Sequence, residues 1–246
     1  MNETIQNLQN HRTIRQFKDT LVPEKLMDDI FEAAIHTASS RATQNASVIR
    51  VKDQAKRDAL AEVSNQAYTA EAPEYLVFLV DCARAASIRS ELGATPETAG
   101  NIDYFREGFT DAILMCQSTV VAAESAGLGT TILGSILNNP AKTIEILGLP
   151  PLTFPAIGLI MGYPNEEPEL KPRIPAGLRV MTDTYQAPDS WVEALAEYDQ
   201  EMHNYYDLRT KNQREDTFTN QILKKMGDNP KGPQLLEAIR AQGFLL

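Results

Sequence analysis

A long stretch almost without charge, residues 108–135, restricts the possible folds of this chain more than any other feature. Its sequence is GFTDAILMCQSTVVAAESAGLGTTILGS. Apolar and small residues recur in its first part every three or four positions, which is the period of one face of an α-helix. Only Asp111 and Glu124 carry charge. A helix that is apolar over most of its circumference is usually buried. The stretch therefore predicts a helix in the core.

The residues that follow predict a strand that ends at a ligand. Gly127 and Gly129 are placed to end the helix, because glycine is favoured just past a helix terminus. A β-prone run at 130–133 comes next and stops at Gly134. The same residues also fit a plain core helix followed by a turn. They match neither a dinucleotide fingerprint, whose glycines follow a strand, nor a phosphate loop, which closes on Gly-Lys-Ser/Thr.

Composition excludes several classes of function. The net charge of −10 disfavours nucleic acid and anionic membranes as partners. The longest apolar run, 152–163, contains a proline and two glycines and is too short to span a bilayer. Cys82 and Cys116 form no CxxC motif, and no signal peptide is evident, so we expect a cytoplasmic protein with reduced thiols.

The titratable residues show no arrangement for a metal site or a hydrolytic triad. The three histidines, at 11, 36 and 203, are far apart in sequence and form no HExxH motif. We therefore expect no metal. A length of 246 residues allows one large domain or two small ones.

Periodicity, prolines and caps predict the other elements. Helices are expected at 3–10, 23–38, 53–63, 140–147 and 190–209, with a helical pattern over 217–246. Strands are expected at 47–52, 156–162, an edge position at 178–182, and 75–81, whose continuous apolar run predicts burial on both faces. Ile5 and Leu8 are expected to point inward, and 84–103 is expected to be a polar connection.

Three clusters of cations stand out on this acidic chain. On an extended segment His11, Thr13 and Arg15 project to one side, where they can grip a phosphate. A proline-stiffened loop presents Lys171 and Arg173, and the segment RTKNQR at 209–214 adds three more cations. Ordinary surface loops, or cations at a helix C-terminus, explain the same residues. Together the clusters favour a phosphorylated, largely apolar cofactor.

Five sequence blocks resemble the family of oxygen-insensitive NADPH nitroreductases and flavin reductases. They are HRTIRQF at 11–17, SSRATQ at 39–44, AAESAGLGTTILGSILNNP at 122–140, GLIMGYP…PELKPRIP at 158–175 and YYDLRTKNQRED at 205–216. The blocks occur in the family's order, and the resemblance is to its larger type. It implies an α+β fold with a central, mainly antiparallel sheet flanked by helices. It also implies an intertwined homodimer with FMN at the subunit interface, and one domain over 1–246 with 190–246 as a helical extension.

The resemblance gives particular residues a role at the cofactor. His11, Arg12, Thr13 and Arg15 would hold the FMN phosphate and ribityl chain, and Ser39 and Gln66 would hydrogen-bond the cofactor. The backbone at Ile132, Leu133, Gly134 and Ser135 would face the flavin ring. Lys171 and Arg173 would complete the anion site, with Lys171 nearer the ring, where a cation stabilises developing negative charge. Arg209 and Arg214 match the family's NADPH-binding pair.

Four residues depart from the family pattern. Thr13 stands where serine is usual, and Ser135 replaces the second glycine after the strand. Arg41 lies in a loop that is commonly rich in serine, and Ala42 stands where a larger aromatic residue is frequent. Arg41 and Ala42 are therefore the expected determinants of substrate preference.

The expected function is transfer of two electrons from NADPH through FMN to nitroaromatics, quinones or free flavin. The flavin carries the chemistry, so we name no catalytic side chain. One alternative is a specialised flavin reductase with a single physiological acceptor. Another is a flavin carrier or redox sensor without turnover, which has no need of the segment with Arg209 and Arg214. The sequence leaves open the physiological acceptor and the choice between NADPH and NADH.

Overall fold

The computed structural model describes residues 2–207, 216–226 and 232–245, and the chain divides into two compact units. The first unit comprises Met1–Pro168 together with Lys231–Leu246, and the second is Glu169–Pro230. The expected single domain over 1–246 stays a prediction.

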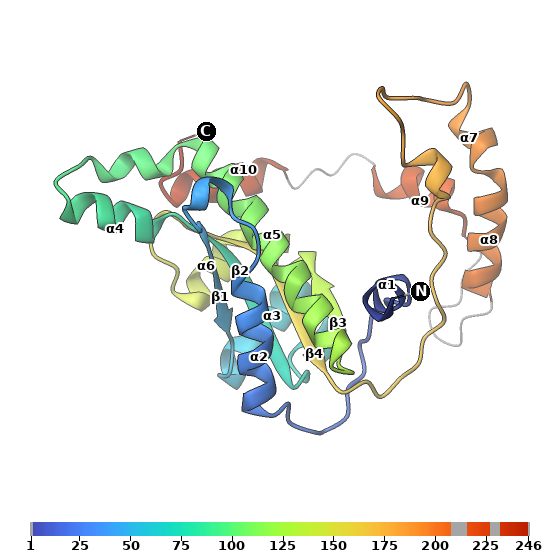
Figure 1. The fold of residues 1–246 in the computed structure, drawn as a ribbon, viewed down its shortest axis with the longest axis horizontal. Coiled ribbons are helices and arrows are strands. Elements are labelled where there is room, and N and C mark those ends of the chain that lie inside the picture. Colours follow the sequence, from blue (N-terminus) through green and yellow to red (C-terminus); the bar gives the residue numbers. More distant parts are fainter. Residues whose placement is uncertain (1, 208–215, 227–231, 246) are drawn as a thin grey trace. The chain divides into compact units, whose positions relative to one another are not determined.

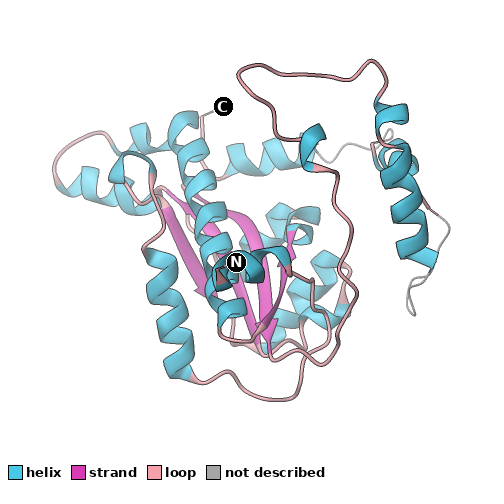
Figure 2. Cartoon of the chain, turned by 45° about the vertical axis from the view of Figure 1, so that its right-hand side comes forward, coloured by secondary structure: helices cyan, strands magenta, loops and turns pink. Residues whose placement is uncertain are grey.

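An antiparallel sheet forms the centre of the first unit (Figure 2). Its strands are β1 (Ala46–Arg50), β2 (Glu74–Asp81), β3 (Gly129–Leu133) and β4 (Thr153–Gly162). They are ordered β1-β2-β4-β3, and each neighbouring pair is antiparallel. The expected α+β fold with a central antiparallel sheet is therefore confirmed.

Helices surround this sheet (Figure 1). Those of the first unit are α1 (Glu3–Gln9), α2 (Glu24–Ile35), α3 (Gln54–Ser64), α4 (Ala83–Glu91), α5 (Ile102–Ser125), α6 (Pro140–Leu147) and α10 (Gly232–Ala241). Asp53 caps α3 as predicted, because its side chain accepts the Lys56 amide at 3.1 Å. In the described part of the chain, no helix has both the length and the apolar character needed to cross a membrane.

The predicted core helix is α5, which crosses one face of the sheet with α2 beside it (Figure 1). The side chains that α5 buries there are small or apolar: Ala112, Cys116, Val120 and Ala123. They pack in one cluster with Leu76 and Phe78 of β2. The alternate residues of β2, Tyr75, Val77 and Leu79, belong to a second cluster with residues of α3 and α6. β2 is thus buried on both faces, as its sequence predicted.

Residues 232–245 return to the first unit and close one end of its core. The ring of Phe244 packs edge-on against Phe105 of α5, with 4.8 Å between their centroids. The Gln242 side-chain amide donates to the carbonyl oxygens of Pro150 and Thr153 at 2.9 and 2.8 Å. This part of the predicted helical extension therefore belongs to the main core.

The second unit contains α7 (Trp191–Ala194), α8 (Ala196–Asp207) and α9 (Phe218–Lys225). Ser190 caps α7, as predicted, and accepts the Glu193 amide at 3.3 Å. Leu195, Tyr198 and Met202 form its small buried cluster. The single helix predicted over 190–209 is interrupted at Leu195.

Three further predictions of local structure are wrong. Residues 84–103 contain most of α4, because ARAASIRSE is rich in good helix formers although it offers little apolar surface. Residues 178–182 form no strand, and Val180 is 74% exposed. Ile5 and Leu8 are 47% and 50% exposed, because α1 buries none of its residues.

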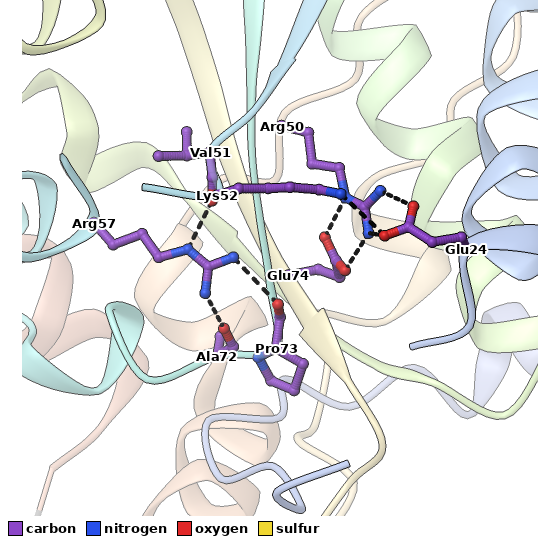
Figure 3. A network of polar contacts seen from close by, with 8 residues as sticks. All are labelled: Glu24, Arg50, Val51, Lys52, Arg57, Ala72, Pro73 and Glu74. Atoms are coloured by element: carbon purple, nitrogen blue, oxygen red, sulfur yellow. Dashed lines mark hydrogen bonds and ion pairs between the residues drawn. The ribbon is translucent and has the colours of Figure 1, made fainter. Parts of the chain in front are cut away.

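A network of ion pairs joins α2, β1 and β2 (Figure 3). Arg50 of β1 donates to both carboxylate oxygens of Glu74 on β2, at 2.7 and 2.6 Å, and also contacts Glu24 of α2. The side chains of Arg50 and Glu74 are only 16% and 7% exposed. Glu74, with a smaller contribution from Glu24, raises the pKa of Arg50, so this guanidinium is charged at any ordinary pH.

Arg57 of α3 supplies the second part of Figure 3. It donates to the backbone carbonyls of Val51, Ala72 and Pro73 at 2.6, 3.0 and 3.2 Å. Burial lowers the pKa of this guanidinium. Its donors bind backbone carbonyl oxygens of the same chain, so we interpret Arg57 as a cation with a structural role.

We expect Arg50→Ala to lower the free energy of unfolding by about 3–5 kcal/mol, because it leaves the buried Glu74 carboxylate without its partner. The matched control is Lys52→Ala, which removes a pair with Glu24 whose side chains are 61% and 65% exposed. That change is expected to cost much less than Arg50→Ala, because an exposed ion pair contributes little to stability. Urea denaturation measures both variants, and equal losses would contradict the interpretation.

Candidate functional site

The segment predicted to grip a phosphate lies along the outer edge of β3. Thr13 forms a parallel bridge with Thr130, and the Ile14 amide donates to the Thr130 carbonyl at 2.9 Å. Ile14 is 6% exposed and packs so closely on Gly129 that a Cβ there would lie 2.6 Å from an Ile14 side-chain atom. The cationic segment is thus fixed to the strand that was predicted to end at a ligand.

Glu124, near the C-terminal end of α5, holds the first residue of this segment. His11 Nδ1 lies 2.8 Å from Glu124 Oε1, and the Thr130 hydroxyl donates to the same oxygen at 2.6 Å. The Glu124 side chain is 15% exposed and Thr130 is fully buried. Buried polar groups require such partners, so these three side chains form one unit.

Glu166 fixes the other end of the segment. Its Oε1 accepts the backbone amides of Arg15 and Gln16 at 2.5 and 3.1 Å. The Asn165 amide in turn donates to the Gln16 carbonyl at 2.9 Å. These contacts define the backbone from which the Arg15 side chain projects.

Arg12 and Arg15 line different cavities, although both were predicted to hold the same phosphate. Arg15 lines a cavity of about 850 Å³ that also includes Tyr68. Arg12 lines one of about 540 Å³ with Glu124 and Glu166. Its Nε is buried and has no hydrogen-bond partner within the described ranges.

The turn that follows β3 meets Gln66. The hydroxyls of Tyr68 and Ser135 donate to Gln66 Oε1 at 3.0 and 3.4 Å. Ile132 is 41% exposed, whereas Leu133 is 2% exposed. Strand β3 therefore presents an apolar side chain shortly before the turn that contains Gly134 and Ser135.

The loop at 39–44 is held by Asp111 of α5. The Ser39 hydroxyl donates to Asp111 Oδ2 at 2.9 Å, and the Ser40 amide donates to Oδ1 at 3.0 Å. Ser39 Oγ also accepts the Gln44 amide at 2.8 Å. The single hydroxyl proton of Ser39 is thus already donated to Asp111. In this arrangement the Ser39 hydroxyl can make a further hydrogen bond only as an acceptor.

Glu107, one turn before Asp111, holds the next part of the loop. Its Oε1 lies 3.0 Å from Arg41 Nη2, and the guanidinium lies over the ring of Tyr104 at 5.7 Å. Arg41 and Ala42 have φ values of 51° and 57°. This left-handed conformation is unfavourable for residues with a side chain and persists only where neighbours impose it. The two expected substrate determinants therefore sit in a strained, anchored loop.

Helix α5 holds Ser39 and His11 at two separate places along its length. Asp111, which holds Ser39, and Glu124, which holds His11, are 13 positions apart (124 − 111) on this helix. At 1.5 Å per residue the separation along the axis is about 20 Å. Within one chain, the residues that anchor Ser39 and His11 are therefore well separated along the helix.

The remaining predicted residues lie beyond the first unit or beyond the described ranges. Lys171 and Arg173 belong to the second unit, where Arg173 donates to the carbonyl oxygens of Lys171 and Pro172 at 2.8 and 3.3 Å. Arg209 and Arg214 lie outside the residues that the structure describes.

Sequence reasoning missed the carboxylates that organise the site. Glu107, Asp111, Glu124 and Glu166 each bind a predicted segment, and none was assigned a role. For the three on α5, the available signal was the rarity of charge in an apolar helix, since a buried carboxylate is costly unless hydrogen-bonded.

The cysteines, by contrast, take no part in the site. Burial raises the pKa of the Cys82 and Cys116 thiols to about 12, so both are neutral at physiological pH. Neither sulfur is therefore available as a thiolate nucleophile.

Comparison with known proteins gives matches along nearly the whole chain. Residues 8–163 match the model of the nitroreductase family, and residues 171–246 match that of the nitroreductase family, C-terminal domain. The chain is 36% identical over 245 residues to an oxygen-insensitive NADPH nitroreductase of Salmonella typhimurium, covering 99% of each chain. It is 34% identical over 245 residues to an NADPH-flavin oxidoreductase of Vibrio harveyi, again covering 99% of each. The crystal structure of nitroreductase A from Vibrio parahaemolyticus superposes with a TM-score of 0.88 at 34% identity, covering 99% of this chain and 98% of that one.

We expect Asp111→Ala to release the loop at 39–44. A hydrogen bond to a charged group contributes about 1.5–3 kcal/mol, so exchange of the Ser40 amide hydrogen should accelerate about 10- to 100-fold. Hydrogen-exchange measurements test this, with Asp103→Ala as the control at an exposed position of the same helix. Unchanged protection of Ser40 in Asp111→Ala would show that the carboxylate does not hold the loop.

Proposed function

The chain belongs to the nitroreductase family, and from that premise we propose that it is an FMN-dependent enzyme that uses NADPH to reduce nitroaromatics, quinones or free flavin. One observation carries the proposal: strand β3 has a cation-bearing segment along its edge and an exposed apolar side chain near its end. His11, Thr13 and Arg15 lie along its edge, and Ile132 is exposed near its end. A phosphate requires cations and hydrogen-bond donors, whereas a flavin ring requires an apolar surface with a few polar groups.

The described residues fit FMN in charge, size and hydrogen bonding. Arg15 lines a cavity of about 850 Å³, and a guanidinium matches the geometry of a phosphate. Gln66 Oε1 already accepts hydrogen bonds from two hydroxyls. The amide nitrogen of Gln66 is therefore the group that can donate a hydrogen bond to a cofactor. FMN, when bound, supplies two-electron transfer between a nicotinamide and an acceptor.

We assign binding and orientation to the side chains. His11, Arg12, Thr13 and Arg15 hold the phosphate and ribityl chain, while Ser39 and Gln66 hydrogen-bond the cofactor. The backbone from Ile132 to Ser135 supports the ring. Lys171 and Arg173 add positive charge, which is most effective where negative charge develops. Arg41 and Ala42 face the acceptor, and Arg209 and Arg214 bind the 2′-phosphate of NADPH through their forked donors.

We also propose that the complete site takes residues from two chains of a homodimer. The separation of about 20 Å between the anchors of His11 and Ser39 supports this, because a second copy can supply the Ser39 loop. Large apolar side chains on the second unit are also exposed, including Val180 at 74%, Tyr185 at 78% and Leu223 at 77%. A subunit interface would remove such side chains from water.

Steady-state kinetics test the proposed reaction. The purified protein should be yellow and should oxidise NADPH only when nitrofurazone, menadione or free flavin is supplied. In the same assay Arg209→Ala and Arg214→Ala should each raise KM for NADPH about 10- to 100-fold and leave KM for NADH nearly unchanged. A yellow protein that never turns over would be a carrier, and equal effects on both nicotinamides would refute the assignment of the arginine pair.

We expect Arg15→Ala to weaken FMN binding about 10- to 100-fold, because a charge-assisted contact with the phosphate is lost. Fluorescence titration of the FMN-free protein measures the dissociation constant. Arg89→Ala is the control, since Arg89 lies on α4 and donates to the Thr95 carbonyl.

Mixed dimers test the two-chain site with the same variant. One chain carries Arg15→Ala and the other Asp111→Ala, which releases the Ser39 loop. If each site combines Arg15 of one chain with the loop of the other, one site is doubly damaged and the second is intact. The mixed dimer should then hold one FMN under conditions where both homodimers are empty. No recovery of FMN would mean that each site is built within one chain.

A further inference from the structure

The contact between His11 and Glu124 determines which nitrogen of the imidazole carries a proton. An ionised carboxylate can only accept hydrogen bonds. The distance of 2.8 Å from Nδ1 to Glu124 Oε1 therefore requires a proton on Nδ1. In a neutral imidazole the other nitrogen, Nε2, then carries none.

The surroundings of Glu124 make this contact selective for one ring orientation. Oε1 receives the Thr130 hydroxyl as well as His11, so both of its acceptor positions are used. The fully buried Thr130 also accepts the Ile14 amide through its carbonyl. The carboxylate, the strand and the segment thus constrain one another, and the His11 ring cannot turn over without breaking the pair.

We infer that Glu124 is a positioning residue: it fixes the Nδ1–H form of His11 and thereby makes Nε2 the nitrogen that meets the anion. The inference rests on the proposed function, in which that anion is the FMN phosphate. A phosphate needs a donor, so Nε2 takes up a proton from solvent when FMN binds. The resulting imidazolium donates Nδ1–H to Glu124 and Nε2–H to the phosphate. No other bond is made or broken.

The charges around the ring agree with this assignment. Glu124 of α5 faces the ring, while β3 contributes only the uncharged Thr130. On its own segment, Arg12 and Arg15 carry fixed positive charge. A carboxylate beside His11 therefore offsets the charge that the ring gains when it binds the phosphate.

Nitrogen NMR on protein labelled in its histidines reads the tautomer directly. The chain has three histidines, and His36 provides an internal control, because its Nδ1 lies 2.8 Å from the Glu32 carbonyl, away from Glu124. At a pH well above the ordinary imidazole value of about 6.5, FMN-free wild type should show His11 protonated at Nδ1 alone. Addition of FMN should protonate Nε2 of His11 and leave His36 unchanged.

Two substitutions of Glu124 distinguish a role in fixing the His11 ring from a contribution to packing alone. Glu124→Met removes the acceptor, so the Nδ1–H form should no longer dominate and FMN should bind about 10-fold or more weakly. Glu124→Gln keeps an acceptor oxygen, so it should retain the Nδ1–H form and bind FMN with intermediate affinity. Glu145→Met, at an exposed glutamate of α6, should change neither readout.

The outcomes are distinct. A dominant Nε2–H form in FMN-free wild type would overturn the inference without any variant being needed. Wild-type affinity for FMN in a folded Glu124→Met protein would also overturn it. An Nδ1–H form in a protein that binds no FMN would refute the cofactor assignment and still support the role of Glu124 in fixing the ring.

Discussion

The hydrogen bonds made by carboxylates on a buried helix govern the arrangement of the candidate site. Helix α5 lies in the core, where a charge is costly unless it is hydrogen-bonded. Asp111 meets this requirement with Ser39 and Ser40, and Glu124 meets it with His11 and Thr130. The loop and the edge segment are therefore located by the helix that they cover. A change in the register of α5 would displace both.

Much of the fold follows from local patterns in the sequence. The apolar period of residues 108–125 and the continuous apolar run at 75–81 correctly indicated α5 and the doubly buried β2. These predictions succeed because burial dictates residue type directly. The failures lie where burial is slight: α4 has few apolar contacts, and Val180 is exposed in a segment whose composition resembles a strand. Nothing in the local sequence distinguishes such cases.

The contacts that join the parts of the candidate site were not predictable from the sequence. Alternation along an extended segment predicted that His11, Thr13 and Arg15 project to one side, and that grouping stays a prediction, whereas Arg12 and Arg15 are seen to line different cavities. The link between Gln66 and Ser135 joins residues 69 positions apart, and that between His11 and Glu124 joins residues 113 apart. Pairings over such distances depend on the order of strands in the sheet. Periodicity carries no information about that order.

The return of residues 232–245 to the main core also governs the order in which the chain can fold. Phe244 and Gln242 complete a cluster around Phe105 and the start of β4, yet the ribosome makes them after the whole of the second unit. Domains usually fold as they emerge during synthesis. Here the first unit leaves the ribosome with one end of its core uncovered and must wait for the second unit to be made. During that interval the aromatic surface around Phe105 lacks the cover that Phe244 provides in the folded chain.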